Sequence, residues 1–273
     1  PVLLPKNRET RWGMMYAWNT WISEFCAYAP DRLVGIGEVP IWDIPRAVEE
    51  ARRVKALGLK GVMMPAIPGY VGCWSCPADA PYTSPVYQPL WDVLEELGLV
   101  IVVHVDAGAA TPGLENYDNP GVNMIINKTL PSEMIASMIC AHVFRDRPNL
   151  KMVCVETGVG WMAHLVAWMD VLIKEHPSMF PGLVEAPSTT FRKHVYGSFL
   201  WDSVGVAQRD LIGVENILWC NDYPHSYGPF PHSHERIELE LKGVSDEDRH
   251  SILAGNAMRV FGLGDPVDMA SER

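Results

Sequence analysis

Six short apolar runs recur along the chain, and amphipathic stretches separate most of them. The runs occupy residues 33–39, 60–65, 99–105, 150–156, 194–200 and 216–221. Most contain too few polar residues for a strand with one face in water, which indicates a parallel sheet covered by helices. The stretches between them place apolar residues at helical spacing, at 44–58, 89–98, 132–146 and 160–176. This alternation predicts strand–helix units joined by right-handed crossovers.

Two architectures can be built from such units, an open doubly wound sheet or part of an eight-stranded barrel. A dinucleotide-binding sheet needs a third glycine at a helix start, and the stretch "GIGEVP" at 35–40 lacks it. No phosphate-binding loop with a Gly-Lys-Ser/Thr ending occurs in the chain. The last helix follows Ser245 and Asp248, which form a capping-box pattern. The length of 273 residues suits one such domain over 1–273.

Polar residues stand at or just beyond the carboxyl ends of the predicted strands. They are Glu38, His104, Asp106, Glu156, Trp201, Asp202, Asp222 and His225. In a barrel of parallel strands these ends meet at one face, and barrel enzymes place their chemistry there. The barrel is therefore the preferred fold, with the candidate site at its mouth.

Each of the three strongest candidates has a functional and a structural interpretation. His104 follows "VIVV" and is either a neutral imidazole that binds a divalent metal or a buried core histidine. Asp222 is either a metal ligand and catalytic carboxylate or a turn former after a strand. Glu156 follows "LKMVCV", where burial would raise its pKa and suit it to carry a proton. Its alternative is an ion pair at the start of the next helix.

The remaining candidates are weaker. His225, Trp201 and Glu38 are expected to contact substrate, and the loop histidines His232 and His234 are less favoured. Histidines on predicted helices are interpreted as surface residues: His142, His164, His176 and His250. Loop aromatic residues suit a planar ligand or ordinary packing: Trp74, Tyr82, Tyr87, Trp201, Tyr223, Tyr227 and Phe230.

The net charge and the cysteine content indicate which classes of partner this protein can bind and which cellular compartment suits it. The formal net charge of −11 argues against nucleic acid and anionic membrane surfaces as partners. No apolar run is long enough to span a bilayer. Six scattered cysteines favour a reducing cytoplasm. Cys73 and Cys76 have ligand-like spacing, but one such pair is a weak zinc signal, and a loop disulfide is the alternative.

Six segments together resemble the amidohydrolase-related (amidohydrolase-2) family, which includes aminocarboxymuconate-semialdehyde decarboxylase and hydroxybenzoate-type decarboxylases. The segments are "APDRLVGIGEVP", "GLKGVMMP", "LVIVVHVD", "RPNLKMVCVETGVGWM", "ILWCNDYPHS" and "GNAMRVFGL". The resemblance implies a distorted (β/α)8 TIM barrel that holds one divalent metal ion, zinc in the first place with manganese as the alternative. It matches His104 to the fifth-strand ligand and Asp222 to the eighth-strand ligand.

Two departures from the family pattern shape the expectations. Residues 1–31 contain no histidine, so the His-x-His of the first strand is absent. We therefore expect an N-terminally truncated, incomplete barrel without its first one or two strands, open beside the strand at 216–221 and exposing unpaired backbone groups there. Glu156 stands where decarboxylase-like members carry a histidine. It either has a raised pKa or serves as a ligand or orienting group.

The resemblance implies a metal-dependent enzyme, with Asp222 and Glu156 as catalytic residues. It would act as a decarboxylase or a hydrolase on a small carboxylated, cyclic or aromatic compound. A metal-free lactonase-like hydrolase and a catalytically inactive barrel that binds a partner are the alternatives. The expected partner is a small-molecule substrate, and homodimer formation is left open.

Overall fold

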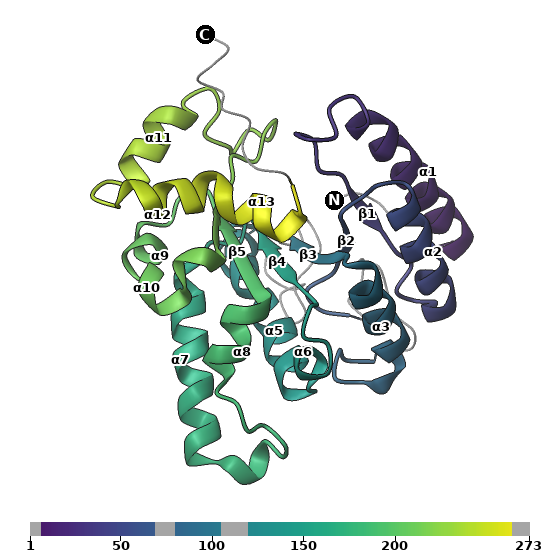
Figure 1. Cartoon of the computed structure of the whole chain (residues 1–273), viewed down its shortest axis with the longest axis horizontal. Coiled ribbons are helices and arrows are strands. Elements are labelled where there is room, and N and C mark those ends of the chain that lie inside the picture. Colours follow the sequence, from purple (N-terminus) through teal and green to yellow (C-terminus); the bar gives the residue numbers. More distant parts are fainter. Residues whose placement is uncertain (1–6, 69–79, 105–119, 264–273) are drawn as a thin grey trace.

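The computed structural model describes residues 7–68, 80–104 and 120–263 (Figure 1). Cys73 and Cys76, the predicted ligand-like pair, lie outside the described residues, as do Trp74 and Asp106. Within the described ranges, no helix is long and apolar enough to cross a membrane.

The six predicted strands are confirmed and form one parallel sheet. They are β1 (Ile36–Glu38), β2 (Gly61–Met64), β3 (Val100–His104), β4 (Met152–Val155), β5 (Val195–Phe199) and β6 (Ile217–Trp219). Their order in the sheet is their order in the sequence, β1-β2-β3-β4-β5-β6. Each strand pairs in parallel with the next, and β1 and β6 are the two edges. This is the arrangement of a barrel with part of its wall absent, as expected.

The predicted helices are also present, with one interruption. They are α2 (Ile44–Ala56), α3 (Gln88–Leu97), α7 (Gly160–Glu175) and, near the C-terminus, α12 (Asp246–His250) followed by α13 (Asn256–Phe261). The Ser245 hydroxyl accepts a hydrogen bond from the Asp248 N–H at 3.2 Å, so this half of the predicted cap is formed. The stretch 132–146 is divided into α5 (Pro131–Cys140) and α6 (Val143–Asp146), because His142 between them has a φ of 61°.

Further helices were not predicted from the sequence. They are α1 (Arg8–Cys26), α4 (Pro120–Ile126), α8 (Pro187–His194), α9 (Ser203–Ala207) and α10 (Arg209–Ile212). The segment that carries His232 and His234 was predicted to lead into a helix, and α11 (Ser233–Glu240) begins there.

Both faces of the sheet are buried, which explains why the strands are so apolar. Alternate side chains of β3, Ile101 and Val103, belong to the main core together with residues of the covering helices. The other side chains of β3, Val100 and Val102, form a second cluster with Val260 of α13, which crosses the inner face of the sheet (Figure 1). Side chains that alternate along a strand point to opposite faces, so each strand contributes to both cores.

The β1 edge of the sheet is covered by α1. The Trp18 indole N–H donates to the Ile36 carbonyl at 3.2 Å. The Asn19 amide donates to the Glu38 carbonyl at 2.9 Å, and its oxygen accepts the Glu38 N–H at 2.7 Å. Side chains of α1 thus take the place of a neighbouring strand at β1, whereas the predicted opening concerns the other edge of the sheet, beside β6.

Candidate active site

The predicted site residues lie at the carboxyl ends of the strands. His104 is the last residue of β3, and Glu156 follows β4 directly. Trp201 and Asp202 come just after β5, and Asp222 comes just after β6. Because neighbouring strands run parallel, these five residues lie at the same end of the sheet.

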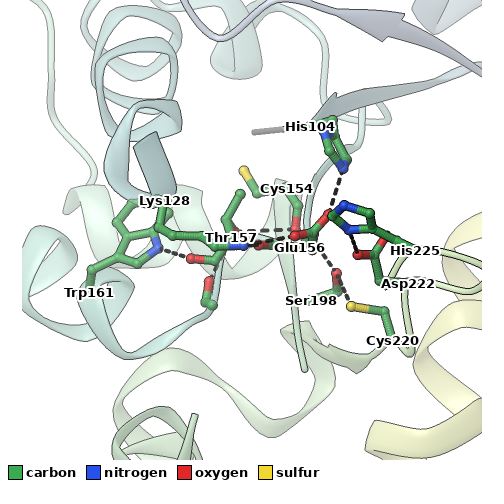
Figure 2. Close-up of polar contacts among 11 residues, drawn as sticks. His104, Lys128, Cys154, Glu156, Thr157, Trp161, Ser198, Cys220, Asp222 and His225 are labelled. Atoms are coloured by element: carbon green, nitrogen blue, oxygen red, sulfur yellow. Dashed lines mark hydrogen bonds and ion pairs between the residues drawn. The ribbon is translucent and has the colours of Figure 1, made fainter. Parts of the chain in front are cut away.

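Glu156 is the centre of a hydrogen-bonded cluster. One carboxylate oxygen of Glu156, Oε2, lies 2.8 Å from Nε2 of His104. The other, Oε1, accepts from the ammonium of Lys128 at 2.9 Å, and the same ammonium donates to the Glu156 carbonyl at 2.6 Å. Figure 2 shows His104 and Lys128 reaching Glu156 from different elements, β3 and the turn after α4.

The charge state of Glu156 follows from these contacts. Burial by itself would raise its pKa, but the hydrogen bonds from His104 and Lys128 and the charge of Lys128 lower the pKa to about 2. The carboxyl is therefore ionised near neutral pH. Of the two interpretations of Glu156, a proton carrier with a raised pKa is contradicted by this environment, and an orienting anion is favoured.

The backbone of Glu156 is held in an unusual conformation. Its φ is 61°, a left-handed value that non-glycine residues rarely adopt. Its N–H donates to the Ser198 hydroxyl at 2.8 Å, while Lys128 binds its carbonyl. The Ser198 hydroxyl in turn donates to the Cys220 sulfur at 3.3 Å, and burial raises the pKa of that thiol to about 11. Cys220 is therefore a structural partner and not a thiolate nucleophile.

Asp222 and His225 form a second pair after β6. Oδ2 of Asp222 lies 2.5 Å from Nδ1 of His225, and Asp222 also has a left-handed φ of 53°. The Asp222 side chain is 19% exposed, whereas that of His225 is 59% exposed. The imidazole therefore shields one side of the carboxylate from solvent while remaining accessible itself.

A cavity of about 350 Å³ opens beside Glu156. It is lined by Lys128, Glu156, Thr157, Gly158, Gly160, Trp161, Leu200, Trp201, Asp202, Val204 and Tyr227. The rings of Trp201 and Tyr227 meet edge to face, with centroids 4.4 Å apart. The Trp161 indole N–H donates to the Thr157 carbonyl at 3.1 Å, which fixes that ring.

Asp202 lines the cavity and holds the adjoining backbone in place. One of its carboxylate oxygens accepts the N–H groups of Val159 and Gly160 at 2.6 and 2.7 Å, and the other accepts the Gly205 N–H at 2.7 Å. These bonds tie the start of α7 to the start of α9. A negative charge at helix N-termini is stabilising, so Asp202 acts as a structural clamp.

The predicted residues are distributed unevenly around this cavity. Glu156 and Trp201 line it, and His104 lies one hydrogen bond behind Glu156. Hydrogen bonds among the described residues join the four predicted polar residues as two pairs, His104 with Glu156 and Asp222 with His225. Glu38 is in neither pair and is not among the described residues that line the cavity. It ends β1 on the same face as Ile36 of the inner core, and burial raises its pKa to about 7.

Two cavity residues were missed by the sequence analysis. Lys128 lies in the polar segment "NKT" without any distinguishing pattern, and Trp161 was assigned to a helix face. Of the loop aromatic residues, Trp201 and Tyr227 line the cavity. Tyr82 and Tyr87 instead pack in the core against Trp91.

A metal site needs several donor side chains close together. Within residues 7–68, 80–104 and 120–263, no three His, Cys, Asp or Glu side chains are grouped so that they could hold a metal ion. His104 and Asp222 remain as two predicted ligands. The described residues thus do not make a complete metal site.

Comparison with known proteins identifies the family. The family model described as Amidohydrolase matches residues 10–263, which is most of the chain. The chain belongs to the amidohydrolase family. The family assignment agrees with the resemblance carried by the six sequence segments, and with the parallel sheet of this structure.

Relatives of this amidohydrolase include named enzymes. The chain is 24% identical to the gamma-resorcylate decarboxylase of Rhodococcus jostii (strain RHA1), over 90% of this chain and 75% of that protein. Among solved structures, an amidohydrolase from Mycobacterium avium subsp. paratuberculosis superimposes with a TM-score of 0.78 at 26% identity, covering 94% of this chain and 66% of that one. The 5-carboxyvanillate decarboxylase of Sphingomonas paucimobilis also gives a TM-score of 0.78, at 23% identity over 94% and 75% of the two chains.

Proposed function

We propose that this amidohydrolase-family protein is a decarboxylase that acts on a small aromatic carboxylate in the cavity beside Glu156. One observation carries the proposal: the Glu156–Lys128 ion pair adjoins a cavity of about 350 Å³ that is lined by the rings of Trp161, Trp201 and Tyr227. Pockets of about this size bury a small ligand, and aromatic walls favour a planar ring. Relatives named as decarboxylases of aromatic acids support this choice of reaction.

The reaction needs a proton at the ring carbon that carries the carboxylate. Addition of the proton to that carbon weakens the bond to the carboxylate, whose electron pair returns to the ring as carbon dioxide leaves. Glu156 holds the imidazole of His104 by a 2.8 Å hydrogen bond, and the two groups form a pair that supplies the proton. Glu156 lines the cavity, so the proton passes from this pair to a ring bound there.

The low pKa of Glu156 favours decarboxylation over hydrolysis in this cavity. A hydrolase would need a base that takes a proton from water, and bases act best when their pKa is near the working pH. With a pKa of about 2, Glu156 is a weak base. As an ionised carboxylate, Glu156 serves decarboxylation by holding and orienting the imidazole of His104.

A divalent metal ion belongs to the proposal through His104 and Asp222, with zinc or manganese as the ion. A dihydroxybenzoic acid decarboxylase from Polaromonas sp. JS666, which shares this fold, has bound manganese. In this chain, His104 would contribute an imidazole nitrogen and Asp222 a carboxylate oxygen to such an ion. Because the described side chains form no complete ligand set, the steps above use only the chain's own residues.

Release of carbon dioxide tests the proposal. The purified protein is incubated with a panel of hydroxybenzoates and related aromatic monocarboxylates, with and without added zinc or manganese. We expect at least one member to yield carbon dioxide and the corresponding arene. Failure with every member, while other family substrates such as cyclic esters are hydrolysed, would contradict it.

A further inference from the structure

Lys128 contacts the Glu156 carboxylate and lines the cavity beside it. It lies in the turn Asn127–Thr129 after α4, and its side chain is 28% exposed. Two hydrogen bonds to Glu156 use two of the three hydrogens of the ammonium group. The third hydrogen is available to a ligand, because Lys128 also lines the cavity.

An anionic ligand in the cavity needs a positively charged side chain nearby to offset repulsion from the carboxylates that line it. Its charged lining residues in the described part of the chain are Lys128, Glu156 and Asp202. An incoming carboxylate would therefore meet two like charges and one opposite charge. Asp202 is committed to three backbone N–H groups, so it stays in place when a ligand enters. Lys128 is the basic side chain of this lining, and it is the group able to offset the repulsion.

The aromatic side chains of the cavity lie close to Lys128, so a ligand ring that packs against them would hold its substituents near the ammonium group. The ammonium lies 5.7 Å from the centroid of the Tyr227 ring, and Tyr227 packs against Trp201. Trp161 lines the same cavity as Lys128, and its indole N–H donates to the Thr157 carbonyl on the same loop as Glu156 (Figure 2). A ring that packs against these residues would place an attached carboxylate near the ammonium.

We propose that Lys128 binds the carboxylate of the substrate and thereby restricts the cavity to anionic ring compounds. The inference rests on the proposed function, and it adds the residue that selects the substrate class. Lys128 would hold the substrate carboxylate and the Glu156 carboxylate at the same time. It would thus set the distance between the proton-supplying pair and the substrate ring.

Binding of two probes of equal shape tests this role. Benzoate and benzamide differ in charge but scarcely in size, and their binding is followed by the fluorescence of Trp161 and Trp201, which line the cavity. We expect the unaltered protein to bind benzoate more tightly than benzamide. Lys128→Gln should weaken benzoate binding about ten- to a hundredfold, the usual worth of a hydrogen bond to a charged group, and leave benzamide within about twofold.

Two further variants separate charge from structure. Lys128→Arg keeps the positive charge and should recover part of the benzoate affinity. Lys174→Gln removes the same charge from the exposed last turn of α7, about 20 Å along the helix from Gly160, and should change neither affinity. Thermal unfolding of each variant shows whether the fold is kept.

The outcomes distinguish this inference from the proposed function. Equal binding of benzoate and benzamide by the unaltered protein, or equal benzoate affinity in Lys128→Gln, would overturn the role of Lys128. Release of carbon dioxide from an aromatic carboxylate would still support the decarboxylase in that case. Absence of both probe binding and carbon dioxide release would overturn both proposals.

Discussion

Two of the predicted catalytic residues are held in left-handed backbone conformations. The φ values are 61° at Glu156 and 53° at Asp222. Such conformations cost free energy in non-glycine residues and persist where the surroundings impose them, often at functional sites. At Glu156 the surroundings are Ser198 on its N–H and Lys128 on its carbonyl. Lys128 therefore acts on both features: it binds the Glu156 carbonyl in the held backbone, and together with His104 it lowers the pKa of the carboxyl.

Replacement of Glu156 by glutamine tests its role in turnover. Glu156→Gln keeps the shape of the side chain but removes the anion that orients His104 and holds Lys128. We expect turnover to fall by about 10²- to 10⁴-fold, the usual contribution of a positioned acid or base. The control Glu185→Gln breaks an exposed ion pair with Lys193 and should leave turnover unchanged. Equal turnover in both variants would show Glu156 to be structural.

Glu38 predicts a pH dependence of stability. Burial raises its pKa from 4.5 to about 7. Between these values the unfolded chain releases a proton that the folded chain keeps, so folding stability falls as the pH rises from about 4.5 to about 7. Glu38→Gln should therefore stabilise the protein above pH 7 by up to about 3 kcal/mol, and little below pH 4.5.

Denaturant unfolding at pH 4.5 and pH 8 measures this difference. Glu49→Gln, on the exposed side of α2, is the matched control and should show no such change with pH. A Glu38→Gln effect that is the same at both pH values would mean that Glu38 titrates normally in the folded protein.

Residue positions could be predicted from the sequence where a local pattern marks them, but their partners could not. His104, Glu156 and Asp222 are recognisable because each ends an apolar run. Lys128 lies 28 positions before Glu156 in the sequence, and only the fold brings the two together. The sign of the pKa shift at Glu156 depends on that partner. Burial alone predicts a raised pKa, which is the opposite of what the ion pair produces.

At the scale of elements, buried strands are easier to predict than the helix α1. Each strand is a compact apolar run because both of its faces are buried. In α1 the buried residues are Met15 and Asn19, while Trp21 and Phe25 are exposed. Its apolar residues therefore do not form the single buried stripe that identifies an amphipathic helix.

Asn19 is expected to secure α1 to the sheet. It is fully buried, bonds to both backbone groups of Glu38, and donates to the Glu50 carboxylate at 2.7 Å. Asn19→Ala removes the partner of both Glu38 backbone groups, while the Glu50 carboxylate keeps Arg53, and should lower the free energy of unfolding by about 1–3 kcal/mol. The exposed Asn149→Ala should change it by less than about 0.5 kcal/mol. Similar unfolding curves for both variants would contradict this role of Asn19.

At the scale of the whole molecule, the cavity adjoins strands that are paired with a neighbouring strand on both sides. It adjoins β4 and β5, in the middle of the order from β1 to β6, and not at the gap between the two edge strands. The chain spans 75% of the length of the Rhodococcus relative. The cavity and the cluster around Glu156 are nevertheless formed by residues within this span.

The position of a solvent proton in the product tests the central claim most directly. The protein converts an aromatic carboxylate in heavy water, and nuclear magnetic resonance locates deuterium in the product. We predict one deuterium at the carbon that carried the carboxylate, formed by the unaltered protein and far more slowly by Glu156→Gln. A product that keeps its carboxyl carbon, or equal rates for both proteins, would contradict decarboxylation at Glu156.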